Sequence, residues 1–204
     1  MPGQLIMLIG MSRLPELKRD QLSPAGQAVW DLLVETRGSQ VVTGEGSLRG
    51  PFNAFLHAPD VGGPLASLGA VLRFGASFGR RLTELAIITI AARWQAEYEW
   101  MAHARLAREA GVPDAVVDAI GRGEEPPFAA EDERIVYAAA RQLAADGHLS
   151  PAAYDAARGL LGDAGVVELV ALCGYYTMIS FMLNAFAVAL PPGVPPMWPA
   201  SQGG

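Results

Sequence analysis

A glutamate and a histidine stand one helical turn apart in a stretch suited to a helix. Ala96, Glu99 and His103 have the spacing i, i+3 and i+7, which places them on one helix face. An imidazole beside a carboxylate can move a proton near neutral pH, because histidine titrates there and the carboxylate tunes its pKa. The spacing therefore indicates general acid-base chemistry, with a plain surface pair of Glu99 and His103 as the alternative.

A second carboxylate, Glu84, opens the preceding predicted helix. That helix is almost wholly apolar from Leu85 to Ala92, so it must be buried, and a carboxylate that leads a buried helix needs a partner. If the two helices pack antiparallel, Glu84 reaches the region of His103 and can hold one tautomer of its ring. The alternative is a solvated Glu84 stabilised by the helix dipole.

The elements that must position these residues are helices. No segment shows sustained alternation of polar and apolar residues between hairpin turns, so the sequence predicts an all-α fold. Ser23-Pro24 and Ser150-Pro151 both have the form of an N-cap followed by a first-turn proline. Residues 40–64, rich in Gly and Pro, are predicted to be a long loop. The predicted helices cover residues 23–38, 65–78, 81–94, 96–110, 113–120, 129–145, 150–161 and 166–190.

Composition excludes several classes of protein. The chain has 204 residues, of which 51% are hydrophobic, so it can bury a sizeable core. Its net charge of -6 argues against nucleic acid as a partner, because such proteins normally show a basic face. The one cysteine, Cys173, excludes a disulfide framework within the chain and any site that needs two thiols. We expect a cytoplasmic protein in which Cys173 is a small buried apolar residue.

The uncharged run from Leu169 to Leu190 is long enough to span a membrane. No Lys or Arg flanks it, and it contains polar residues such as Asn184, so a helix buried in a core or an oligomer interface is favoured, with no membrane partner. The N-terminus lacks the features of a signal peptide. Residues 1–10 are expected to be a frayed extension, and residues 192–204 an extended or disordered tail.

The motif formed by Glu84, Glu97-Tyr98-Glu99-Trp100 and His103 resembles the core motif of the carboxymuconolactone decarboxylase family. That family shares its fold with the alkyl hydroperoxidase proteins. The resemblance extends from about Leu14 to Pro191. It implies a single domain over residues 11–191, an alkyl hydroperoxidase-like helical bundle, and assembly into a homo-oligomer, either a trimer or a hexamer.

The resemblance also separates two branches of chemistry. In the peroxidase branch a glutamate, a Cys-x-x-Cys pair and a histidine relay protons to a reactive thiol. Glu84 and His103 match the glutamate and the histidine, whereas Ala96 and Glu99 stand where the two cysteines would be. Without those thiols no disulfide can form at the site. The decarboxylase branch, which needs neither thiol nor cofactor, is therefore favoured.

The family reaction removes CO2 from γ-carboxymuconolactone, which requires carboxylate binding, oxyanion stabilisation and delivery of one proton. His103 is the expected proton donor, with Glu99 and Glu84 tuning its pKa. An arginine fork pairs with carboxylates, and Arg49 is the first choice, ahead of Arg93 and Arg73. The remaining candidates for substrate contact are His57, Tyr98, Trp100 and Glu97.

Each of these assignments has a structural alternative. Arg49 can hold its loop through a salt bridge, His57 can bond to backbone, and Tyr98 and Trp100 can belong to the core or an interface. No metal site is expected, because the three histidines have no ligand-pair spacing. At the level of function, peroxide reduction and a ligand-binding oligomer without catalysis are the alternatives to a lyase acting on a small carboxylated lactone.

Overall fold

The computed structural model describes residues 12–198, and its regular structure is helical. Within that range the only β pairing consists of two isolated bridges, Lys18 with Ser47 and Val42 with Leu48. The predicted all-α fold is therefore confirmed. In chain order the elements are η1 (Arg19–Gln21), α1 (Pro24–Arg37), η2 (Ser39–Val41), α2 (Phe52–His57), α3 (Pro59–Gly75), α4 (Gly79–Arg93), α5 (Glu97–Glu109), α6 (Asp114–Arg122), α7 (Glu131–Asp146) and α8 (Pro151–Ala185).

Helix α4 is the centre of the fold. Every residue from 82 to 91 is buried, and α4 contacts α3, α5, α6, α7 and α8. The short connection through Gln95, which has a φ of +47°, returns α5 along α4 and brings Glu84 level with His103. Arg81 at the start of α4 forms ion pairs with Asp132 and Glu133 of α7 and so fastens the two helices together.

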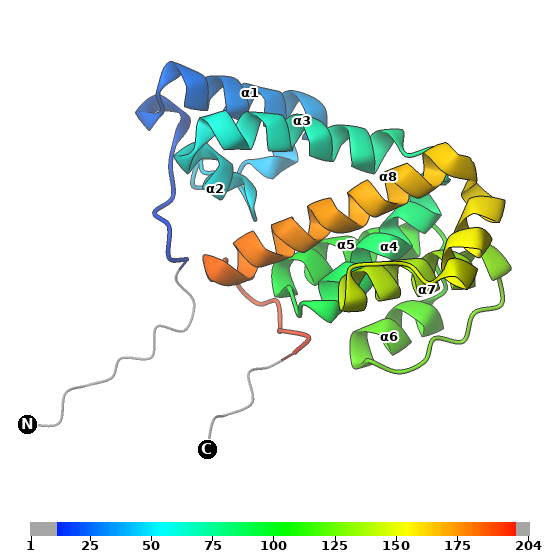
Figure 1. The fold of residues 1–204 in the computed structure, drawn as a ribbon. Helices are drawn as coiled ribbons and strands as arrows, with labels where there is room; N and C mark the ends of the chain where they lie inside the picture. Colours follow the sequence, from blue (N-terminus) through cyan, green and yellow to red (C-terminus); the bar gives the residue numbers. More distant parts are fainter. Residues whose placement is uncertain (1–11, 199–204) are drawn as a thin grey trace, which may run out of the picture.

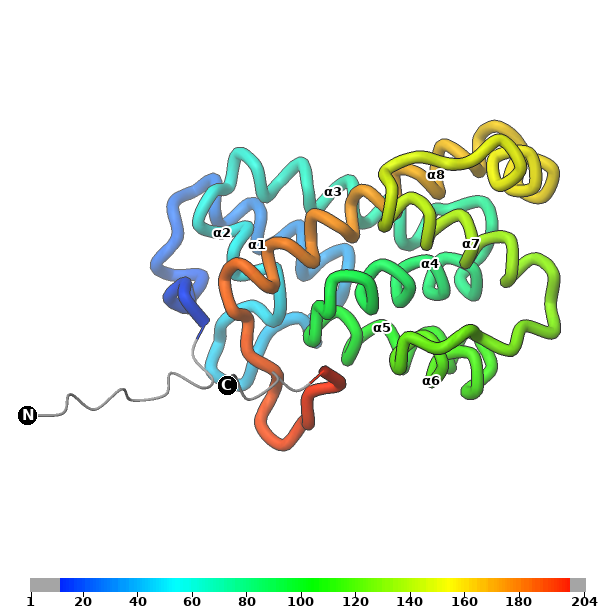
Figure 2. Tube along the Cα trace, turned by 60° about the horizontal axis from the view of Figure 1, so that its bottom comes forward, coloured from blue at the N-terminus to red at the C-terminus, as the bar shows by residue number. Residues whose placement is uncertain are grey.

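The helices form two groups that α8 connects. Figure 1 shows α1, α2 and α3 together in the upper part, α4 to α7 in the lower part, and α8 running obliquely between them. Figure 2 gives the same relation from another direction, with α8 alongside both α3 and α4. The site described below lies where α1, α3, α4, α5 and α8 approach one another, so it depends on all of these elements.

The predicted loop over residues 40–64 is wrong in part. The segment contains α2, and α3 begins at Pro59 rather than at residue 65. Its glycines misled the prediction, because Gly62 is not a turn residue. A Cβ on Gly62 would lie 2.3 Å from the backbone oxygen of Phe55, so the glycine allows α2 and α3 to approach closely.

The last two predicted helices form α8, which Gly162 interrupts with a φ of +69°. The helix ends at Ala185 rather than at Leu190, because the chain turns at Ala187, where φ is +49°. In the part of the chain that the structure describes, α8 alone is long and apolar enough to span a membrane. Half of its most apolar 18-residue window, with a mean hydropathy of 1.7, is buried inside the fold.

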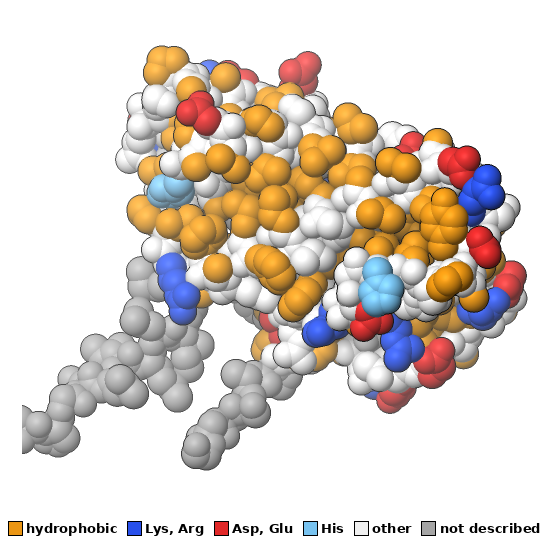
Figure 3. Space-filling model, in the orientation of Figure 1, with side chains coloured by type: hydrophobic (Ala, Val, Ile, Leu, Met, Phe, Trp, Pro, Cys, Tyr) orange, Lys and Arg blue, Asp and Glu red, His pale blue; other side chains and the backbone are white. Residues whose placement is uncertain are grey.

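Part of the remaining surface of α8 is exposed and apolar, as at Val167, Val170 and Phe181. Every large apolar side chain that is exposed within residues 12–198 lies on α3 or α8. Figure 3 shows apolar side chains gathered over these two helices. No charged residue occurs at 61–72 of α3 or at 169–185 of α8. We call this surface the α3/α8 stripe and define it by Val61, Leu68, Val71, Phe74, Val167, Val170 and Phe181.

The segment that follows α8 is held against the fold as far as the structure describes it. The backbone N–H groups of Met197 and Trp198 each donate to the carboxylate of Glu97 over 2.7 Å. The indole N–H of Trp198 donates to the carbonyl oxygen of Gly121 over 2.9 Å. Figure 2 shows this segment below α5 and beside α6. The predicted extension at residues 1–10 and the tail beyond residue 198 lie outside the described residues.

Candidate active site

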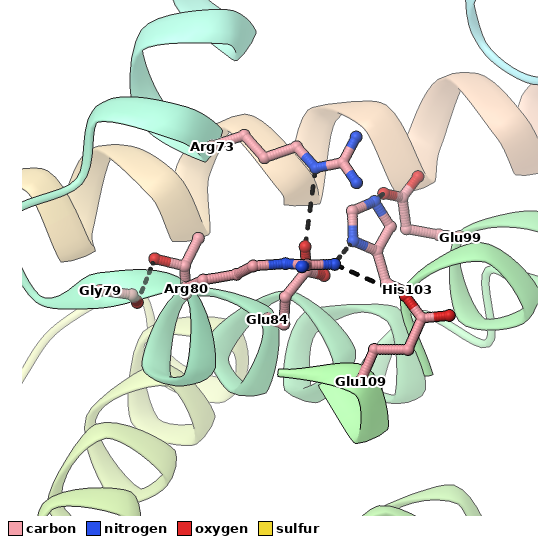
Figure 4. A network of polar contacts seen from close by, with 8 residues as sticks. Arg73, Gly79, Arg80, Glu84, Glu99, His103 and Glu109 are labelled. Carbon is pink, nitrogen blue, oxygen red and sulfur yellow. Dashed lines mark hydrogen bonds and ion pairs between the residues drawn. The ribbon is translucent and has the colours of Figure 1, made fainter. Parts of the chain in front are cut away.

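The imidazole of His103 lies between two carboxylates. Its Nδ1 is 2.6 Å from Oε2 of Glu84, and its Nε2 is 3.0 Å from Oε1 of Glu99. All three side chains are buried, with no residue more than 5% exposed. Figure 4 shows the ring between the two carboxylates, with the Arg73 guanidinium extending above Glu84 toward the ring. The antiparallel packing of α4 and α5 thus makes the contact between Glu84 and His103 that the sequence analysis considered.

The two carboxylates favour the charged form of the imidazole. Burial alone would lower the pKa of His103, but the negative charges of Glu99 and Glu84 outweigh it and raise that pKa. Burial alone would likewise raise the pKa of Glu84, but His103 and Arg73 outweigh it and lower that pKa. The result is an imidazolium that persists above the ordinary titration range of histidine, and so can serve as a proton donor at neutral pH.

A cavity of about 430 Å³ opens beside this network, a size suited to a small ligand. Glu99 and His103 line its inner end, and the ring of Tyr176 packs edge-on against the imidazole at a centroid distance of 5.2 Å. Aromatic rings form much of the remaining wall. Four arginines also line the cavity, which makes it suited to an anion: Arg37, Arg49, Arg73 and Arg105.

Three of the predicted substrate contacts, Arg49, Arg73 and Tyr98, lie on this cavity. Arg49 lines it and donates from Nε to the carbonyl oxygen of Gln40 over 3.1 Å. Tyr98 lines it as well, and its ring packs closely on Gly50, where a Cβ would lie 2.5 Å from the nearest ring atom. Gly50 has a φ of +59°, so the loop that carries Arg49 needs a glycine here for two reasons.

The structure does not bring the other predicted contacts to the cavity. His57 Nε2 lies 2.9 Å from the carbonyl oxygen of Pro15 on the surface. Glu97 binds the C-terminal segment, and Trp100 packs edge-on against Trp198 at 5.3 Å. Arg93 lies over the ring of Trp94, away from the cavity. These four residues make these contacts within the fold and do not line this cavity.

Helix geometry explains this division within α5. Consecutive helix residues differ by about 100° in direction, so Glu97 and Trp100 share one face, while Glu99 and His103 share another. Three residues of the cavity were not predicted from the sequence, Arg37 of α1 and Tyr175 and Tyr176 of α8. Only the adjacent tyrosines in an otherwise apolar helix gave a local signal of a polar site, and nothing in the sequence around Arg37 pointed to it.

Within the described residues, no thiol lies at the site. Ala96, at the first of the two cysteine positions, is fully buried, and Glu99 occupies the second. Cys173 is buried in α8 and does not line the cavity, and burial raises the pKa of its thiol to about 12. Such a thiol is not a nucleophile at neutral pH. Over residues 12–198 no group of three or more His, Cys, Asp or Glu side chains is arranged to hold a metal ion.

Comparison with solved structures identifies the fold of this chain. A peroxidase-related protein with an alkylhydroperoxidase AhpD core, from Ralstonia eutropha, matches with a TM-score of 0.71 over 89% of this chain and 93% of its own, at 16% identity. The chain has the AhpD fold. The debrominase Bmp8, solved as a variant in complex with 2,3,4-tribromopyrrole, matches with a TM-score of 0.68 over 89% of this chain and 95% of its own, also at 16% identity.

The AhpD fold agrees with the bundle that the sequence resemblance implied. A third structure, a protein of unknown function from Agrobacterium tumefaciens, matches with a TM-score of 0.61 over 70% of this chain and 99% of its own, at 14% identity. No family model and no curated protein sequence matches the chain. At these identities the likeness extends to the fold, on which different chemistries are built, and the function must be argued from the site.

Proposed function

We propose that the protein is a cofactor-independent lyase of the carboxymuconolactone decarboxylase type, acting in the cytoplasm on a small carboxylated lactone or a related molecule. The observation that carries this proposal is the buried Glu84, His103 and Glu99 network at the inner end of a cavity lined by arginines. The network can supply a proton, and the arginines can attract a carboxylated ligand.

The reaction needs few components. Cleavage of the bond between the ring and a carboxylate releases CO2 and leaves an electron pair, which moves into the conjugated lactone carbonyl as an oxyanion. The arginines of the cavity can stabilise that oxyanion. The His103 imidazolium then donates a proton to a ring carbon and becomes neutral, and solvent returns the proton. The carboxylate of Glu84 stays ionised and in contact with Nδ1 of His103, which keeps the ring oriented.

Peroxide reduction is disfavoured by the site itself. Ala96 and Glu99 replace the two thiols, and Cys173 lies away from the cavity with a raised pKa. A carboxylate at position 99, beside Nε2 of His103, supports proton transfer in place of thiol chemistry. A ligand-binding protein without catalysis is the competing hypothesis, and the experiment below separates the two.

The purified protein is incubated with γ-carboxymuconolactone while ultraviolet absorbance is followed, and separately with an organic hydroperoxide and a thiol donor. We expect loss of the lactone signal and no peroxidase turnover. His103→Gln should lower kcat at least about 100-fold, because general acid catalysis contributes on that order. Glu131→Gln, an exposed change on α7, should stay within about twofold of wild type. Equal turnover by His103→Gln would overturn the proposed mechanism.

We also propose that the protein is a homo-oligomer, a trimer or a hexamer, that assembles through the α3/α8 stripe. Two chains of net charge -6 repel at long range, so copies can meet most easily through a face without charge. The stripe is such a face, and its uncharged apolar surface can be covered by a neighbouring copy of the chain. The absence of Lys and Arg from residues 169–185 gives an anionic membrane surface nothing to attract.

A further inference from the structure

Two of the cavity arginines are not matched by carboxylates of their own. Arg37, in the last turn of α1, is half-buried and donates to Thr36 Oγ1 over 2.8 Å and to the carbonyl oxygen of Ala66 over 3.2 Å. Its guanidinium also lies 5.0 Å from the ring centroid of Phe52. None of these partners carries a negative charge. Within residues 12–198, no carboxylate lies within ion-pair distance of Arg37.

Arg73, in the last turn of α3, is only partly matched. Its Nε is buried without a hydrogen-bond partner and lies 3.6 Å from Oε1 of Glu84, beyond hydrogen-bond distance. Glu84 is already engaged by His103 through its other oxygen. Figure 4 shows the Arg73 guanidinium extending past Glu84, with its end free of drawn contacts. The hydrogen-bonding capacity of this guanidinium is therefore available to a ligand.

The charges around the inner part of the cavity do not balance. Three cationic groups, Arg37, Arg73 and the His103 imidazolium, face two carboxylates, Glu84 and Glu99. Burial lowers the pKa of Arg37; the neighbouring Tyr175 and Tyr176 offset part of this effect, and the positive charge of Arg73 adds to it. A half-buried charge without a counter-ion is costly, and a bound anion would remove that cost.

We propose that Arg37 and Arg73 together bind a carboxylate group on a small flat ligand. A guanidinium presents a planar fork that matches a carboxylate, and two such forks line the same cavity from α1 and α3. The walls between them and His103 are aromatic, with Phe52, Tyr175 and Tyr176, which suits a flat unsaturated body. The identification of this ligand with the substrate rests on the proposed function, but the binding site itself does not.

The probe is 2-furoate, a flat five-membered ring with one carboxylate, and its uncharged methyl ester is the matched control. Binding is measured by ligand-observed NMR and by isothermal titration with the full chain. Wild type should bind 2-furoate saturably and bind the ester at least about tenfold more weakly. Arg37→Gln and Arg73→Gln should each weaken furoate binding at least about tenfold, the low end for a hydrogen bond to a charged group. Arg134→Gln, a surface change on α7, should have no effect.

Thermal unfolding of the free variants distinguishes binding from a structural role. Arg37→Gln should unfold at the wild-type temperature or above it, because it removes a positive charge that has no carboxylate partner. A structural role for Arg37 predicts a lower unfolding temperature. Furoate should raise the unfolding temperature of wild type and not that of Arg37→Gln.

The outcomes are separable from those of the lactone assay. No saturable furoate binding to wild type, or binding that Arg49→Gln abolishes while Arg37→Gln and Arg73→Gln retain it, overturns this proposal. Loss of binding in Arg37→Gln and Arg73→Gln supports it even if the lactone is not turned over, in which case the proposed reaction alone fails.

Discussion

His103 owes its charge state to groups that lie on different helices. Glu99 is one turn away on α5, whereas Glu84 reaches the ring from α4. Both carboxylates raise the pKa of His103 against the effect of burial. The pH at which the imidazolium loses its proton therefore limits both its action as a proton donor and its contribution to the stability of the fold.

The stability that this network contributes should have two pH limits. The pKa of His103 is raised on folding, so its contribution is fully present below its unfolded pKa, about 6.5, and is lost as pH rises through the raised value. The pKa of Glu84 is lowered, so its contribution is present above its unfolded value and is lost as pH falls through the lowered value. Urea unfolding of wild type and His103→Gln across pH should show a stability difference that shrinks at alkaline pH. A constant difference would contradict this prediction.

The pH profile of turnover should respond to Glu84. In Glu84→Gln the imidazole loses one of the two negative charges that raise its pKa. The alkaline limb of the kcat profile should therefore move to lower pH, because the imidazolium is the proposed donor. Glu131→Gln, exposed on α7, should leave that limb in place. An unchanged limb in Glu84→Gln would show that Glu84 does not set the charge of His103.

Sequence spacing predicted this part of the site because helix periodicity is local. Glu99 and His103 are close through one turn of α5, and a buried carboxylate at Glu84 had to find a partner. Arg37 and Tyr176 were not predicted, since their proximity to His103 arises from the packing of α1 and α8. The contact between Trp100 and Trp198 was not predicted for a similar reason, because the segment that carries Trp198 gave no local signal.

At the scale of elements, close approach between helices decides where glycine is required. The predicted loop at residues 40–64 treated Gly and Pro as breakers, whereas Gly62 lies inside α3 against the backbone of Phe55. Helix starts at Ser23 and Ser150 were predictable, since each side chain accepts a hydrogen bond from the backbone N–H three residues on. The sequence shows that residues 40–64 are rich in Gly and Pro. Whether a glycine there forms a turn or allows two helices to pack closely depends on tertiary contacts, which the sequence does not show.

Gly62→Ala should destabilise the fold by about 1 to 3 kcal/mol, because the added methyl group would meet the backbone oxygen of Phe55, which cannot rotate away. Gly75→Ala, in the same helix with no neighbour within 4 Å of its Cβ position, should be neutral or slightly stabilising. Urea unfolding of both variants measures the difference. A Gly62→Ala variant as stable as Gly75→Ala would mean that α2 and α3 are not closely packed at this point.

At the scale of the whole molecule, the large exposed apolar side chains of residues 12–198 lie on α3 and α8. Sedimentation or light scattering should give a mass that is a multiple of the 21.5 kDa chain. The double variant Val71→Glu and Val170→Glu should dissociate, since both positions are exposed within the uncharged ranges of α3 and α8. Ala115→Glu, exposed on α6, should leave the mass unchanged. A wild-type mass of one chain would overturn the oligomer proposal.

Phe74 belongs both to the α3/α8 stripe and to the lining of the cavity, and its neighbour Arg73 contacts its ring at 5.1 Å. If copies meet at the stripe, a ligand in the cavity and a neighbouring chain contact the same side chain. Their binding free energies are then coupled, and the coupling is reciprocal. Dilution that separates the chains should weaken furoate binding, and saturating furoate should shift the dissociation of the oligomer by the same factor.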